Sequence, residues 1–330
     1  MDDKITVGII ARNEEKNISE TLKLILNQSM DYSKYEVLVI DGNSDDNTRE
    51  IAENVLSNSN INYKVLNEKD FGFYGHCFAR NLVIDNSAKN AEYIAFTDAD
   101  CLVDRDWLAT LYNAIKQTDD NVAGAGGPRL VAKTDNKKEL IINTLITSFL
   151  ASGANPAFHS RDIKYIKSIA NYNAIYKKSI ISKFRYDDSL IMSDDNELNF
   201  RLSKSGYKFL NVPEAKIWHH ETGSLREFAS NMFKYGVNIT NTVKKHRSMI
   251  TINVPLTTIF ILYIILITPL YYLFGFISIV PMFLYILFAI LVFLEVIIRT
   301  KSLYALLVFI LLPVEHVLYG LGVFWNILKR

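Results

Sequence analysis

The first part of the chain alternates between short apolar runs and segments whose apolar residues recur at helical spacing. The apolar runs, which we predict as strands, are 5–10, 35–40, 63–66 and 93–96, and the helical segments between them are 14–28, 48–56 and 79–86. Continuous apolar strands separated by helices predict a mostly parallel α/β sheet with helices on both faces. Ligands bind to such a sheet beyond the carboxyl ends of its strands.

Polar clusters follow these predicted strands at the point where each one ends. Residues 11–15 read ARNEE, residues 41–46 read DGNSDD, and residues 98–100 read DAD. The two carboxylates of Asp98 and Asp100, on a turn, can converge on one hard cation, and Mg²⁺ and Mn²⁺ prefer oxygen ligands that they share with phosphate. The pattern therefore predicts a metal site for a diphosphate, with a solvated acidic turn as the alternative.

A second group of carboxylates, SDDNE at 193–197, opens a helical segment that continues NFRLSKSGY. Acidic residues are favoured at a helix N-terminus by the helix dipole, and a carboxylate there can equally act as a general base. The two interpretations are compatible. Further along, the strand-like segment AKIWHH at 215–220 ends in His219 and His220, each of which is a candidate metal ligand or a structural histidine.

Charged residues almost vanish after Ile252. Three apolar stretches lie there, at 252–274, 277–294 and 303–327, and three in succession predict a membrane region of two to three helices rather than buried core helices. The basic residues at 244–247 precede the first stretch, so the positive-inside rule predicts a multi-pass protein of the cell membrane with a cytoplasmic catalytic domain. Lys329 and Arg330 conflict with that topology if all three stretches cross, and the third can instead lie in the interface.

These patterns predict three parts: a catalytic domain at 1–225, an interfacial helix and basic linker at 226–250, and a membrane region at 251–330. The linker has helical spacing and aromatic and basic residues, so it can lie on the membrane lipid or pack on the catalytic domain. The net charge of +1 gives no basic face for a nucleic acid, and two cysteines are too few for a disulfide framework.

Five stretches of the sequence, in this order, resemble the inverting family 2 glycosyltransferases, which have a GT-A nucleotide-binding fold. They read VGIIARNEEKNI, YEVLVIDGNSDDNT, ARNLVIDNSAKNAEYIAFTDADC, SDDNELNFRLSKSGYKF and AKIWHHETGSLREF, and they lie within residues 5–240. The resemblance extends most closely to membrane-anchored enzymes of exopolysaccharide and glycan assembly.

The resemblance implies a site for a nucleoside-diphosphate sugar of the UDP or GDP type. The residues implied to bind this donor are Ala11, Asn13, Glu15, Asp41, Arg80, Asp98 and Arg201. Those implied to hold Mg²⁺ or Mn²⁺ are Asp98, Asp100 and His219, and Asp195 is implied as the base, with Asp194 orienting it or binding the acceptor. Gly42 departs from the family, which commonly has a second acidic residue at that position.

We therefore expect a metal-dependent inverting transfer of a sugar to a hydroxyl of a membrane-associated, lipid-linked glycan. A polyprenyl-phosphate sugar synthase is the alternative, since its phosphate acceptor is already ionised and needs no base. A processive polysaccharide synthase is disfavoured because the Q-x-x-R-W motif of that group is absent. A nucleotide-sugar-binding membrane scaffold without activity is the remaining class, and the intact DAD and SDD motifs argue against it.

Overall fold

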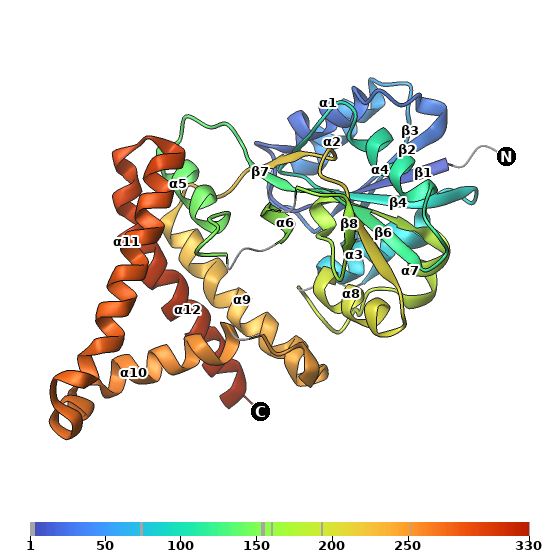
Figure 1. Cartoon of the computed structure of the whole chain (residues 1–330). Coiled ribbons are helices and arrows are strands. Elements are labelled where there is room, and N and C mark those ends of the chain that lie inside the picture. Colours follow the sequence, from blue (N-terminus) through green and yellow to red (C-terminus); the bar gives the residue numbers. More distant parts are fainter. Residues whose placement is uncertain are drawn as a thin grey trace. The chain divides into compact units, whose positions relative to one another are not determined.

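The computed structural model describes residues 4–72, 75–152, 156–159, 161–192, 194–251 and 253–329. The chain forms two compact units (Figure 1). The sheet unit consists of Met1–Leu130 and Pro156–His219, and the helical unit consists of Val131–Asn155 and His220–Arg330. Residues 131–155 therefore group with the C-terminal helices, although the chain on either side of them belongs to the sheet unit.

The sheet unit is built on an eight-stranded sheet with the order β3-β2-β1-β4-β9-β6-β10-β8. Its strands are β1 (Lys4–Ala11), β2 (Tyr35–Asp41), β3 (Asn62–Asn67), β4 (Ala91–Asp98), β6 (Val122–Gly126), β8 (Lys164–Ile166), β9 (Ala174–Lys177) and β10 (Lys208–Asn211). The first four run parallel, whereas β9 is antiparallel to both β4 and β6. The predicted α/β fold with a mostly parallel sheet is confirmed.

Helices cover both faces of this sheet. Alternate residues of each strand point to opposite faces, and both sets are apolar and buried. The helices are α1 (Ile18–Leu26), α2 (Thr48–Ser57), α3 (His76–Asn86), α4 (Trp107–Lys116), α7 (Lys178–Phe184) and α8 (Asp194–Lys204). Val37 and Val39 of β2 belong to one apolar core with Leu22 of α1. Leu38 of β2 belongs to the opposite core with Val83 of α3. The buried apolar runs read from the sequence are thus strands buried on both sides.

A second, three-stranded sheet has the order β5-β11-β7 and consists of β5 (Cys101–Val103), β7 (Arg129–Val131) and β11 (Ile217–His219). Its register pairs His219 with Cys101, so β11 ends beside the residue that follows the DAD turn. Short turns of helix complete the unit: η1 (Tyr32–Lys34), η2 (Glu68–Phe71), η3 (Asn171–Asn173) and α6 (Pro156–His159).

The helical unit contains α5 (Lys137–Ile146), α9 (Leu225–Lys245), α10 (Asn253–Phe274), α11 (Val280–Thr300) and α12 (Val308–Leu328), with the turns η4 (Arg247–Met249), η5 (Gly275–Ile279) and η6 (Leu303–Leu307). Its apolar core joins α5, α9, α11 and α12 through residues such as Ile142, Phe228, Val292 and Leu311. Two helical stretches, Val254–Thr300 and Leu303–Leu328, are long and apolar enough to cross a membrane.

Candidate active site

The polar clusters that follow β1, β2, β3 and β4 lie at one edge of the sheet. The register places Ala11 beside Asp41, Asp41 beside Asn67, and Asp98 beside Ile10. Parallel neighbours end at the same edge, so the ARNEE, DGNSDD and DAD segments come together as the sequence pattern predicts. This edge is where a ligand of a parallel sheet is expected.

The buried guanidinium of Arg80, on α3, connects two of the acidic clusters. Its Nη2 donates to Oδ1 of Asp98 at 3.0 Å, and its Nε donates to Oδ2 of Asp194. The guanidinium also lies over the ring of Phe96, 5.0 Å from the centroid, and the side chain is only 2% exposed. Within the described part of the chain, Nη1 is buried without a hydrogen-bond partner. Arg80 thus ties the end of β4 to the start of α8 and keeps one donor unused.

The adjacent carboxylates of Asp194 and Asp195 have different environments. Burial raises the pKa of Asp194, but the neighbouring Arg80 and His76 and a 2.7 Å hydrogen bond from Asn171 lower it below the ordinary value of 3.8. Burial and the charge of Asp194 raise the pKa of Asp195 to about 7. Asp194 therefore stays ionised, whereas Asp195 can exchange a proton near neutral pH.

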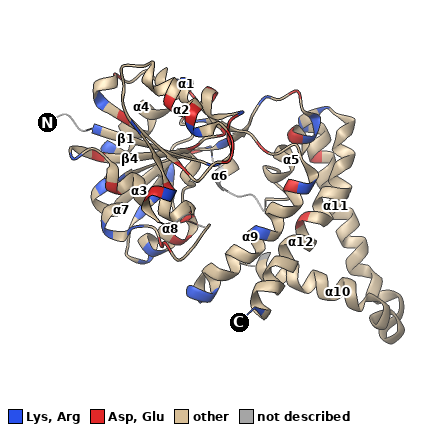
Figure 2. Cartoon of the chain, turned by 180° about the vertical axis from the view of Figure 1, so that it is seen from behind, with Lys and Arg blue, Asp and Glu red and all other residues tan. Residues whose placement is uncertain are grey.

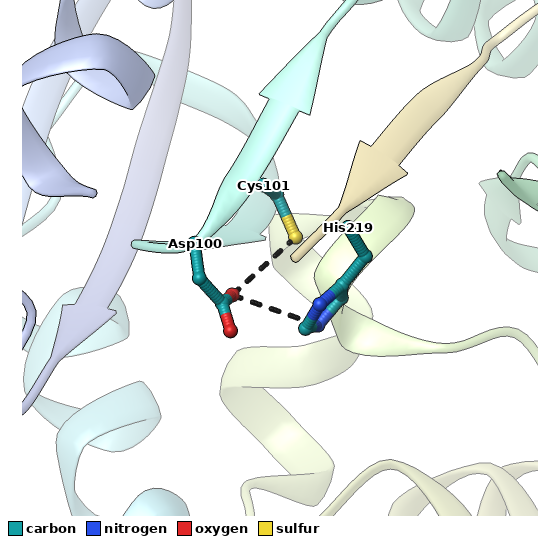
Figure 3. A group of neighbouring side chains, drawn as sticks. All are labelled: Asp100, Cys101 and His219. Atoms are coloured by element: carbon teal, nitrogen blue, oxygen red, sulfur yellow. Dashed lines mark hydrogen bonds and ion pairs between the residues drawn. The ribbon is translucent and has the colours of Figure 1, made fainter. Parts of the chain in front are cut away.

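Asp100, Cys101 and His219 form a compact group, shown in Figure 3. Oδ1 of Asp100 lies 3.5 Å from Nε2 of His219 and 3.8 Å from Sγ of Cys101, and the three potential ligand atoms lie within 4.8 Å of one another. Burial raises the pKa of the Cys101 thiol well above its ordinary value, and Asp100 and Asp98 raise it further. The thiol is therefore neutral, and the other two potential ligand atoms of the group are a carboxylate oxygen and an imidazole nitrogen, a set that fits a divalent cation.

The two neighbouring histidines have separate environments. His219 lies beside Asp100, and its ring packs edge-on against Tyr172 with centroids 5.5 Å apart. His220 instead places Nδ1 2.7 Å from Oε1 of Glu139, within the helical unit. Of the two, only His219 is brought to the DAD turn.

The loops after β1 and β2 are tied together by hydrogen bonds between side chains and backbone. Oδ1 of Asn13 accepts from the backbone of Asp45 at 2.8 Å, and the carboxylate of Glu15 accepts from the amide of Asn47 at 3.3 Å. Asp41 is 1% exposed and accepts from the side chain of Asn67 at 2.9 Å. These contacts hold the loops in one arrangement at the edge of the sheet.

The structure places Arg201 in a different network. Its Nε and Nη2 bond to Glu197 at 2.7 and 2.8 Å, and its Nη1 and Nη2 donate to the carbonyl oxygens of Phe184 and Arg185. These contacts join α8 to the end of α7. They do not include the acidic residues at 98–100, so a contact between Arg201 and a diphosphate stays a prediction.

Three carboxyl and thiol groups near the site were not predicted from the sequence. Burial and the charge of Asp100 raise the pKa of Glu14 to about 7, and burial raises that of Glu68 to about 7. Cys101 completes the group around Asp100. Glu14 was not predicted because it is adjacent to Glu15 in a polar run. The sequence alone does not show which of the two carboxyl groups is buried.

Comparison with known proteins agrees with this geometry. The family model "Glycosyl transferase family 2" matches residues 6–185. A protein of Methanococcus voltae, dolichyl N-acetyl-alpha-D-glucosaminyl phosphate 3-beta-D-2,3-diacetamido-2,3-dideoxy-beta-D-glucuronosyltransferase, is 26% identical over 98% of this chain and 97% of its own length. The probable glycosyltransferase YdaM of Bacillus subtilis is 28% identical over 66% of this chain, which spans about half of that protein (51%).

A solved structure shares the fold across the whole chain. The mannosyltransferase PcManGT from Pyrobaculum calidifontis, in complex with GDP-Man and Mn²⁺, superposes with a TM-score of 0.59 at 17% identity, covering 100% of this chain and 88% of that one. The family match covers more than half of the 330 residues, and the fold and the strand-end acidic clusters agree with it. The chain therefore belongs to glycosyl transferase family 2 and is a glycosyltransferase with the GT-A fold.

Proposed function

We propose that this glycosyltransferase moves a sugar, with inversion and with the help of a divalent metal ion, from a nucleoside-diphosphate donor to a hydroxyl of a membrane-associated, lipid-linked saccharide. The observation that carries the proposal is the position of Arg80 between Asp98 and Asp194. One buried cation links the turn proposed for the donor diphosphate to the carboxylate pair proposed for the acceptor, so both substrates would meet on one rigid framework.

The donor, of the UDP or GDP type, would lie along the edge formed by the ends of β1, β2 and β4. Ala11, Asn13, Glu15 and Asp41 would border the nucleoside, since their loops meet there. The unused Nη1 of Arg80 supports a contact with a diphosphate oxygen, because a buried donor without a partner is costly.

The metal, Mg²⁺ or Mn²⁺, would be held by Asp100 and His219, and Asp98, the first residue of the DAD turn, would be the third ligand. The support is the 3.5 Å approach of the Asp100 and His219 ligand atoms. When bound, such an ion neutralises negative charge on a leaving diphosphate. Because Asp98 already accepts a hydrogen bond from Arg80, it would bind the ion and the guanidinium at the same time.

The base would be Asp195. The acceptor hydroxyl attacks the anomeric carbon, the bond from that carbon to the diphosphate oxygen breaks, and the hydroxyl proton passes to the carboxylate of Asp195. Its raised pKa suits this role, because a base titrating near neutrality is both ionised and basic enough to take the proton. Asp194 stays ionised against Arg80 and would orient its neighbour or the acceptor.

The acceptor proposal rests on the helical unit and on the relative from Methanococcus voltae. That relative matches over nearly its whole length, and its name describes transfer to a dolichyl-phosphate-linked N-acetylglucosamine. Two apolar helical stretches would anchor this chain to the membrane, where such acceptors reside, with the sheet unit on the cytoplasmic face.

The test uses membranes from cells that produce the full chain, supplied with labelled UDP- and GDP-sugars, Mn²⁺ and a lipid extract. We expect label in lipid-linked saccharide, with inverted anomeric configuration, which chelation of the metal abolishes. Membranes containing the Asp100→Ala variant provide the matched control. Donor binding without transfer to any acceptor would favour an inactive scaffold, and polyprenyl phosphate as the best acceptor would favour a polyprenyl-phosphate sugar synthase.

A further inference from the structure

Within the helical unit, α9 and α12 lie side by side along their whole length and run in the same direction (Figure 1). Near their starts, Phe228 shares an apolar cluster with Leu311. In the middle, the two backbones touch: a Cβ at Gly236 would lie 2.0 Å from the carbonyl oxygen of Tyr319. The two helices therefore occupy the same layer from end to end.

The last turns of the two helices are joined by polar contacts. Asn326, near the end of α12, is 6% exposed, and its Nδ2 donates to the carbonyl oxygen of Val237 at 2.8 Å and to Oδ1 of Asn241 at 2.7 Å. Nζ of Lys244 donates to the carbonyl oxygen of Asn326 and lies 3.3 Å from that of Lys329. A cation on the last carbonyl groups stabilises a helix C-terminus. The end of α12 is thereby fixed beside the basic end of α9.

Most of the exposed residues of α9 are polar, and basic residues lie at its end (Figure 2). The exposed polar residues are Arg226, Glu227, Ser230, Lys234, Asn241, Lys244 and Lys245, and Leu225 and Tyr235 are exposed beside them. An ionised lysine such as Lys234, near the middle of the helix, would cost about 3 kcal/mol or more at the centre of a bilayer. α9 therefore stays in water or in the headgroup layer, and α12, in contact with it throughout, stays in the same layer.

The beginning of α12 follows a turn that comes after α11, and the end of α11 is tied to the residues that follow α5. At the end of α11, the carboxylate of Glu295 accepts from the hydroxyl of Ser148 and the backbone of Phe149, both at 2.7 Å, and Nη1 of Arg299 donates to the carbonyl oxygen of Thr147 at 2.9 Å. These partners directly follow α5, which has 10 residues and is too short to cross a bilayer. The chain on either side of this segment belongs to the sheet unit.

We infer that α10 and α11 form a hairpin that crosses the bilayer, whereas α12 does not cross and instead lies with α9 in the membrane interface. α10 has 22 residues and α11 has 21, so each is about 30 Å long and sufficient to span. α10 leaves the layer of α9, and α11 returns to the α5 segment. Both ends of α12 then lie on the same side of the membrane.

The partner of this layer is the lipid surface itself. The exposed residues of the second half of α12 are apolar: Leu321, Phe324, Trp325, Ile327 and Leu328. Together with the exposed polar residues of α9, they give the pair an apolar surface for lipid and a polar surface for water, as in interfacial helices. This arrangement also places Lys329 on the same side as the basic residues at 244–247, which removes the charge conflict that three crossings create.

The inference is tested by labelling single introduced cysteines in the full chain with a membrane-impermeant maleimide, on intact cells and on opened membranes. Lys301→Cys and Lys329→Cys mark the two ends of α12, Ser248→Cys marks the end of α9, and Phe276→Cys marks the tip of the hairpin, all at exposed positions. The unaltered chain is the control, because Cys77 and Cys101 are buried and should not react. Labelling after denaturation confirms that each variant is present.

We expect positions 248, 301 and 329 to react from one face of the membrane and position 276 from the other. Reaction of 301 and 329 from opposite faces would show that α12 crosses and would overturn the inference. Reaction of position 276 under the same conditions as position 248, either both on intact cells or both only after the membrane is opened, would contradict the crossing hairpin. Sugar transfer is not measured, so the result stands or falls independently of the proposed reaction.

Discussion

Nη2 of Arg80 lies 3.0 Å from Oδ1 of Asp98, and this contact fixes the turn after β4 to a guanidinium that also holds the start of α8. The acidic residues at 98–100 and at 194–195 are far apart in the sequence, yet a single buried cation positions both. One side chain thus sets the distance between the proposed donor and acceptor sites, so the loss of Arg80 should affect fold and activity together.

We predict that Arg80→Met destabilises the protein by about 3–5 kcal/mol, because it leaves two carboxylates near the core without their cation. Arg80→Lys should be less destabilising but should still lose most activity, since one ammonium does not reproduce a planar fork between two carboxylates. Thermal unfolding in detergent measures the first effect and sugar transfer the second. Wild-type stability in the Arg80→Met variant would show that the contacts of the guanidinium with Asp98 and Asp194 do not stabilise the fold.

The two histidines offer a matched pair for the metal proposal. His219→Ala should weaken Mn²⁺ binding and transfer, because it removes the imidazole beside Asp100. His220→Ala should keep Mn²⁺ affinity, since that ring bonds to Glu139 instead. Titration of purified protein with Mn²⁺ separates the two variants. Equal loss in both, or loss only in His220→Ala, would contradict the ligand set.

The pH dependence of transfer should report the raised pKa of Asp195. A base is active when ionised, so kcat/KM should rise with pH and level off above about 7. The Asp195→Asn variant should lack this rising limb. Glu68→Gln is the control, because Glu68 is another buried carboxyl whose pKa is raised to about 7, yet it lies outside the proposed chemistry. Should the limb vanish in Glu68→Gln and persist in Asp195→Asn, the base has been misplaced.

Glu68 should also affect stability, with a sign fixed by its pKa. Burial raises this pKa from 4.5 to about 7, so the folded protein favours the protonated carboxyl, and that contribution is full below pH 4.5 and is lost as the pH rises through 7. Glutamine resembles the protonated form. The melting temperature of Glu68→Gln relative to wild type should therefore increase between pH 4.5 and 8, whereas a constant difference would show that Glu68 is already ionised in the fold.

Much of the sheet could be predicted because its strands are short, apolar and followed by polar turns. The run 93–96 with DAD after it led directly to β4 and its terminal Asp98. The antiparallel strand β9 was not predicted, because its four residues carry no signal of direction and the pairing with β4 and β6 is a tertiary choice. The same limit applies to α5, because its place among the C-terminal helices depends on contacts that Glu295 and Arg299 make with Thr144 of α5 and with the residues directly after it.

Only part of the candidate site could be predicted from the sequence, because some of its contacts depend on how the strands pair. Asp98, Asp100 and Asp194 stand in recognisable motifs, whereas the approach of His219 to Asp100 depends on the register of β5 and β11. The contact of Arg201 with Glu197 follows the i, i+4 spacing of a helix and could have been anticipated from it.

The central claim is that Asp195 takes the proton of an acceptor hydroxyl during metal-dependent transfer. The most direct test is the kcat of Asp195→Asn with saturating nucleotide sugar, Mn²⁺ and lipid-linked acceptor, with donor affinity measured alongside. Asparagine keeps the size of the side chain but does not take the proton, so kcat should fall by at least about 100-fold while donor affinity changes little. Asp194→Asn should affect kcat less and the KM for the acceptor more. A kcat close to that of wild type in Asp195→Asn would contradict the account.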